Sequence, residues 1–166
     1  MMKKTFLILV LFLGALICLL GYARKDYFTA IGHKAPALRV DELDNAVRSD
    51  ESAGRYVLLN FWSSADAPSR RDANVYTAWL RKHPEAELSL VSVNFDKSEG
   101  LFHEIVRRDS LNASEQYNVS GNDALKVSNA YGLKSDGGYG TLLLSPAGRI
   151  VAHNPTPQQL SELFGE

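Results

Sequence analysis

The sequence predicts an α/β fold with a mixed central sheet flanked by helices, preceded by an N-terminal apolar helix. Short continuous apolar runs are typical of strands buried on both faces, and they alternate with longer segments of helical periodicity. Strands joined by helices pair in parallel through right-handed crossovers, whereas two short strands joined by a turn near the C-terminus add an antiparallel edge. With 166 residues, 45% of them hydrophobic and 22% charged, the chain can bury the core of one such domain.

The chain begins with an apolar run at residues 6–23, which has basic residues on both sides. The run is close to the ~20 residues that span a membrane as a helix, and it is slightly longer than the core of a secretory signal. Residues 1–25 are therefore interpreted as a signal anchor or as a signal peptide cleaved after Ala23. Cys18 adds a lipoprotein as a third hypothesis. Each hypothesis carries the rest of the chain across the membrane.

Residues 26–35 are predicted to be a linker, and residues 36–166 a folded domain. At the start of the domain, the polar composition predicts a turn at residues 43–45 and a loop at residues 48–55. The continuous apolar run at residues 56–61 predicts the first buried strand.

Two helices of the central region each have one apolar face. The first spans residues 67–82 and the second residues 98–109, with a buried strand at 88–94 between them and a loop at 110–121 after them. Their inner faces carry apolar side chains spaced three or four residues apart: Val75, Tyr76, Trp79 and Leu80 in the first helix, and Leu101, Phe102, Ile105 and Val106 in the second.

The C-terminal region is predicted to contain a helix at residues 122–131, a hairpin and a final helix. The hairpin strands, 142–144 and 150–152, are joined by a turn of sequence SPAG. The final helix begins with a capping box and buries one apolar side. Its capping residues are Thr156, Pro157 and Gln159, and its predicted buried residues are Leu160, Leu163 and Phe164.

The content of cysteine and charge excludes several functions for the folded part. The single cysteine, Cys18, lies in the apolar run, so no disulfide framework, cysteine-ligated zinc site or cysteine nucleophile is expected beyond it. No basic stripe predicts nucleic-acid binding, and the four histidines lack metal-ligand spacing. The sequence therefore predicts no metal, no cofactor and no nucleic-acid partner.

Several segments resemble the TlpA/ResA-like thiol-disulfide oxidoreductases of the thioredoxin-like superfamily. Residues 57–64 (VLLNFWSS) resemble the strand that enters their active-site loop, and residues 91–96 (VSVNFD) resemble their second core strand. Residues 131–133, 142–144 and 148–151 resemble the C-terminal hairpin region. The resemblance covers about residues 32–166 and implies a thioredoxin-like fold.

The resemblance breaks at the redox centre. In the family, the Phe-Trp strand end leads into Cys-x-Pro-Cys-Arg, whereas residues 66–70 here read DAPSR. Asp66 and Ser69 stand at the two cysteine positions, and Pro68 and Arg70 match. Dithiol exchange needs a thiolate as the attacking group, which neither a carboxylate nor a hydroxyl replaces. The chain is therefore predicted to be a degenerate, redox-inactive member.

The loop that faces this site in the family also differs. The family places a cis-proline before the hairpin strand, whereas residues 137–141 here read GGYGT. Tyr139 stands at the proline position. Because a cis bond costs about 3 kcal/mol for a residue other than proline, we expect a trans peptide there.

The candidate binding surface consists of the former active-site residues and the facing loop: Trp62, Asp66, Ala67, Pro68, Ser69, Tyr139 and Gly140. Asp66 is interpreted chiefly as the N-cap of the following helix, with a functional carboxylate as the alternative. Ser69 is interpreted as a first-turn serine, with a nucleophile as the alternative. Trp62 either packs beneath the loop or contributes to an exposed aromatic patch.

These observations predict a membrane-tethered domain of the cell envelope, on the periplasmic side, that binds or assembles a protein partner without dithiol chemistry. The resemblance implies that the partner is an extended polypeptide held at the former active-site surface. One alternative is an accessory role in periplasmic thiol-disulfide homeostasis that uses a partner's cysteines. A second alternative is a non-redox enzyme that combines Asp66 and Ser69 with a histidine brought close by folding.

Overall fold

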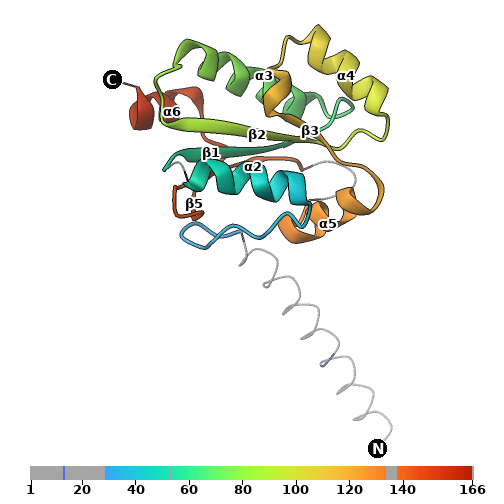
Figure 1. Cartoon of the computed structure of the whole chain (residues 1–166), viewed down its shortest axis with the longest axis horizontal. Helices are drawn as coiled ribbons and strands as arrows, with labels where there is room; N and C mark the ends of the chain where they lie inside the picture. Colours follow the sequence, from blue (N-terminus) through green and yellow to red (C-terminus); the bar gives the residue numbers. More distant parts are fainter. Residues whose placement is uncertain (1–12, 14–28, 53, 134–137, 166) are drawn as a thin grey trace, which may run out of the picture.

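A computed structural model describes residues 29–52, 54–133 and 138–165, together with Leu13. Five strands within these ranges form one sheet in the order β3-β2-β1-β4-β5 (Figure 1). The strands β1 (Tyr56–Trp62), β2 (Leu88–Asn94) and β3 (Gln116–Asn118) are parallel. The strands β4 (Thr141–Leu144) and β5 (Ile150–His153) form the predicted antiparallel hairpin against β1. The predicted α/β architecture with a mixed sheet is confirmed.

Helices cover both faces of the sheet (Figure 1). One face carries α3 (Ala67–Lys82), α4 (Glu99–Arg108) and α6 (Pro157–Phe164), and the other carries α2 (Asp41–Ser52) and α5 (Gly121–Tyr131). Alternate residues of β1 point to opposite faces. Leu59 and Phe61 pack in the core beside α2 and α5, while Leu58 and Trp62 pack beneath α3, α4 and α6. The continuous apolar run of β1 is thus buried on both sides.

Helix α2 replaces the turn and the polar loop that were predicted for this region, so that prediction was wrong. Its inner side carries Leu43, which is buried, and Val47. The carboxylate of Asp44 accepts hydrogen bonds from the backbone N–H groups of Leu38 (2.9 Å) and Arg39 (3.0 Å), which ties the preceding segment to the helix. Because few apolar residues line this helix, its polar composition resembles that of a loop.

The predicted loop at residues 110–121 also contains regular structure. A short 3-10 helix, η1 (Ala113–Glu115), leads directly into β3, which pairs in parallel with the second half of β2. Three polar or aromatic residues are too short a segment to produce a strand pattern. The loop prediction was therefore wrong at this point, and the sheet has one more strand than the sequence predicted.

Two of the predicted inward-facing leucines are exposed. Leu163 of α6 is 60% exposed and Leu101 of α4 is 45% exposed. In α6, Leu160 is fully buried, and the ring of Phe164 packs edge-on against Tyr56 at a centroid distance of 5.1 Å. The capping box of α6 is present as predicted, with Thr156 and Gln159 bonding each other's backbone N–H groups.

Residues 32–35 lie along the outer edge of β5. The N–H of Gly32 donates to the C=O of Ile150 (2.7 Å), and the N–H of Ile150 donates to the C=O of His33 (2.9 Å). Ordered contacts therefore begin before residue 36. The predicted apolar segment at residues 6–23 lies outside the described residues except for Leu13. Within the described ranges, no helix has the length and hydrophobicity needed to cross a membrane.

Candidate functional site

Asp66 is the N-cap of α3, as predicted. One of its carboxylate oxygens accepts a hydrogen bond from the backbone N–H of Ser69 (3.1 Å). Ser69 is buried, and its hydroxyl donates to the C=O of Asp66 (3.1 Å) and accepts from the N–H of Ser63 (3.3 Å). Asp66 and Ser69 therefore hold the loop between β1 and α3 in place.

A buried carboxylate, Asp96, anchors the same loop from below. It accepts hydrogen bonds from the hydroxyl of Ser63 (2.7 Å), the N–H of Ser64 (2.9 Å) and the side-chain amide of Asn94 (3.1 Å). Burial of a carboxylate is tolerated when it accepts several hydrogen bonds in this way. Asp96 was not among the predicted site residues, although an aspartate shortly after a buried strand was a usable signal.

The edge strand β3 is connected to this network. The side-chain amide of Asn118 donates to Asn94 Oδ1 (2.8 Å) and to the C=O of Asp96 (3.0 Å). The loop after β1 and the ends of β2 and β3 therefore form one hydrogen-bonded unit. This unit presents Ala67 and Pro68 to solvent and leaves Asp66 half-exposed.

Trp62 does not belong to the exposed surface, so its interpretation as part of an aromatic patch was wrong. Its side chain is fully buried and packs against Phe102, at a ring-centroid distance of 6.3 Å, in a cluster with Ala73 and Ile105. Because side chains alternate along a strand, the side chain of Trp62 points from β1 toward α3 and α4. With Ser69 also buried, the accessible part of the predicted surface is reduced to Asp66–Pro68 and the facing segment.

Arg70 is engaged in an ion pair with Asp109, just beyond the end of α4. Its guanidinium donates two hydrogen bonds to the carboxylate, from Nε (2.7 Å) and from one terminal nitrogen (2.6 Å), and Asn74 donates a third (3.2 Å). The hydrogen bonds from Arg70 lower the pKa of Asp109, and the bond to Asp109 raises the pKa of Arg70. The pair joins α3 to α4 beside the loop.

The segment before β4 lies against the end of β1. The C=O of Gly140 accepts from the N–H of Phe61 (3.0 Å), and the half-buried ring of Tyr139 contacts Phe95 at a centroid distance of 5.3 Å. Burial raises the pKa of the Tyr139 phenol, and the negative charges of Asp66 and Asp96 raise it further. No peptide bond between described residues is cis, so the trans peptide expected at Tyr139 is confirmed.

Gly140 is confined by the side chain of Asn154. The Oδ1 atom of Asn154 accepts a hydrogen bond from the N–H of Thr141 (2.7 Å), and a Cβ atom at position 140 would lie 2.9 Å from that oxygen. The absence of a side chain at Gly140 therefore allows Asn154 to hold the start of β4.

We predict that Gly140→Ala lowers the free energy of unfolding by about 1–2 kcal/mol, because displacing Asn154 leaves the buried N–H of Thr141 without its acceptor. Gly100→Ala in α4 is the matched control, since a Cβ there would meet Ser98 Oγ at 3.9 Å. Alanine should raise stability at that helical position. Urea unfolding of both variants measures the difference, and an equal effect at the two glycines would contradict the prediction.

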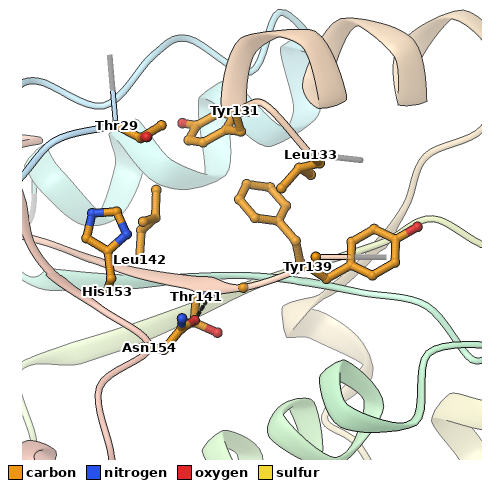
Figure 2. Close-up of a pocket in the computed structure, with 11 residues that line it drawn as sticks. Thr29, Tyr131, Leu133, Tyr139, Thr141, Leu142, His153 and Asn154 are labelled. Atoms are coloured by element: carbon orange, nitrogen blue, oxygen red, sulfur yellow. Dashed lines mark hydrogen bonds between the residues drawn. The ribbon is translucent and has the colours of Figure 1, made fainter. Parts of the chain in front are cut away.

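A cavity of about 180 Å³ lies between this segment and the end of α5. Figure 2 shows Tyr131 and Leu133 from the end of α5 on one side of the space, and Leu142 of β4 and His153 of β5 on the other. The ring of Tyr139 extends away from the space (Figure 2). This cavity could not be predicted from local sequence patterns, because its walls come from segments distant in the sequence.

A solved structure similar to this chain is that of a thioredoxin-like protein from Parabacteroides distasonis, at 32% identity and a TM-score of 0.60, over 66% of this chain and 79% of that protein.

The chain belongs to the thioredoxin-like family.

Further solved structures share the fold of this thioredoxin-like chain. The thioredoxin domain of a thiol-disulfide oxidoreductase from Bacteroides vulgatus is 20% identical, with a TM-score of 0.61, over 81% of this chain and 94% of that domain. StoA from Bacillus subtilis is 20% identical, with a TM-score of 0.52, over 66% of this chain and 81% of that protein. The predicted thioredoxin-like fold is confirmed. Neither a protein-family model nor a curated protein matches the chain.

Proposed function

We propose that this thioredoxin-like domain binds an extended polypeptide outside the cytoplasm, while tethered to a membrane, and performs no dithiol chemistry. The observation that carries the proposal is the state of the former redox site. Asp66 and Ser69 are bonded within their own loop, while the facing segment at residues 138–140 borders an open cavity.

The absence of dithiol chemistry follows from the residue types. The single cysteine of the sequence, Cys18, is remote from the site in the sequence. A thiolate at the start of α3 would be stabilised by the helix and would attack a disulfide sulfur. The carboxylate of Asp66 occupies that place and acts as a cap.

The backbone at Tyr139 supports binding of an extended chain. Neither its N–H nor its C=O forms a hydrogen bond with another residue in the described ranges. An extended polypeptide that adds to such an edge gains affinity from main-chain hydrogen bonds and specificity from neighbouring pockets. The end of the segment is positioned by the hydrogen bond from Phe61 to Gly140 and by that from Thr141 to Asn154.

The geometry does not favour the enzyme alternative. Ser69 is 3% exposed, and both hydrogen bonds of its hydroxyl are to backbone groups. A serine nucleophile needs a base within hydrogen-bond reach and access to substrate. Asp66 uses its carboxylate on the backbone of α3.

The proposed location outside the cytoplasm rests on two independent features. The apolar run at residues 6–23 has the length and flanking charges of a membrane signal or anchor. The fold is shared with a thiol-disulfide oxidoreductase, and the disulfides on which such proteins act persist mainly in oxidising compartments outside the cytoplasm. Both features support placement in the cell envelope.

The test is capture of a polypeptide partner by crosslinking with the full chain in native membranes. Tyr139→Ala should reduce capture about tenfold, because the variant loses the aromatic surface of the segment. Leu125→Ala, an exposed residue of α5, should leave capture unchanged. Equal capture by the wild type and both variants would place the interface elsewhere. Altered thiol status of envelope proteins on deletion of the gene would favour the accessory alternative.

A further inference from the structure

We infer that the cavity beside Tyr139 receives one aromatic side chain of the bound polypeptide, and that a basic residue next to it in that polypeptide pairs with Asp66. This inference rests on the proposed polypeptide-binding function and names the partner's chemistry at the same site.

The cavity matches a single ring in size and character. Its volume is about 180 Å³, and an apolar cavity of about 150 Å³ is known to bind benzene. Apolar walls come from Phe61, Leu133 and Leu142, which suit the faces of a ring. The exposed residues His153 and Asn154 add polar atoms, which accommodate a tyrosine hydroxyl as well as a plain phenyl ring.

The cavity and the backbone of Tyr139 belong to one segment. Gly138, Tyr139 and Gly140 all line the cavity, and Tyr139 carries the backbone groups that no described residue bonds. Successive side chains of an extended chain point to opposite sides. A polypeptide paired with Tyr139 would therefore direct one side chain into the cavity and the next toward the far side of the segment.

Beyond the far side of the segment lies the half-exposed carboxylate of Asp66. The ring of Tyr139 extends away from the cavity (Figure 2) and contacts Phe95, and it lies in the field of the carboxylates of Asp66 and Asp96. The nearest arginine along α3, Arg70, is committed to Asp109. Asp66 is half-exposed and has no ion-pair partner among the described residues, so a basic side chain complements it.

The test measures binding of short fluorescent peptides to the full chain in detergent by anisotropy. The probe peptide, Ser-Gly-Phe-Lys-Ser-Gly, is compared with one that carries Ala in place of Phe and one that carries Ala in place of Lys. Loss of the ring should weaken binding at least about tenfold, as expected for burial of a phenyl group. Loss of the lysine should weaken binding about two- to fivefold at low salt and less at high salt.

Protein variants separate the two contacts. His153→Trp fills the cavity and should abolish the preference for Phe, whereas His103→Trp, at an exposed histidine of α4, should keep it. Asp66→Asn preserves the helix cap and should abolish the preference for Lys alone. Unchanged circular dichroism confirms that each variant is folded.

Two outcomes would overturn the inference without touching the proposed function, and a third would overturn both. Equal affinity for the Phe and Ala peptides would show that no ring enters the cavity. A preference for Phe that survives His153→Trp would show that the ring binds outside the cavity. Absence of binding by every peptide, together with no captured partner in membranes, would refute polypeptide binding itself.

Discussion

Replacement of Trp62 by alanine should lower the free energy of unfolding by about 3–5 kcal/mol, the range found for buried aromatic residues. The indole is fully buried between β1, α3 and α4 and contacts Phe102. The cavity left behind cannot be filled, because its neighbours belong to a sheet and two helices that are fixed by other contacts. Urea unfolding followed by circular dichroism measures the loss.

Trp62→Phe is the matched control for this prediction. The indole N–H of Trp62 has no hydrogen-bond partner among the described residues, so phenylalanine removes none of the hydrogen bonds within them. We expect it to cost at most about 2 kcal/mol, from lost packing alone. A loss below about 1 kcal/mol for Trp62→Ala would show that the side chain is not part of the core.

Loss of either partner of the Arg70–Asp109 pair should destabilise the domain by about 2 kcal/mol, because a charged hydrogen-bonding group is left with its partner removed. The carboxylate of Asp109 is 11% exposed, and the pair is bidentate. Arg70→Met and Asp109→Asn should each show the effect, and the double variant should cost less than their sum.

The pH dependence of this pair has a defined sign. The folded-state pKa of Asp109 is lowered, principally by the hydrogen bonds from Arg70. Its contribution is therefore complete above the unfolded-state pKa of about 3.9 and is lost as the pH falls through the lower folded-state value. The stability difference between wild type and Asp109→Asn should shrink below about pH 4. Arg107→Met, in an exposed pair with Glu104, is the control and should change stability little at any pH.

The strands and helices with strong apolar periodicity could be predicted from the sequence, and the two missed elements show why the others could not. Helix α2 buries little beyond Leu43 and Val47, so its pattern is dominated by polar residues that also occur in loops. Strand β3 owes its existence to backbone pairing with β2 and to Asn118 bonding Asn94. Both depend on tertiary contacts that a local pattern does not contain.

The candidate site was predictable where a residue acts locally. The cap at Asp66 follows from its position before a helix, and the trans peptide at Tyr139 follows from the residue type. The face of the sheet to which Trp62 points depends on how side chains alternate along β1 and on which face α3 covers. The anchoring role of Asp96 depends on two loops meeting beyond the ends of neighbouring strands.

The contact of residues 32–35 with β5 bears on how the domain avoids self-association. An outer strand with free N–H and C=O groups is a template for pairing with a neighbouring molecule. At Ile150, the first residue of β5, the C=O is already bonded to Gly32 and the N–H to His33. The opposite edge of the sheet, β3, is three residues long, which is too short to template an extended pairing. Short free edges of this kind disfavour growth of a continuous intermolecular sheet between copies of the domain.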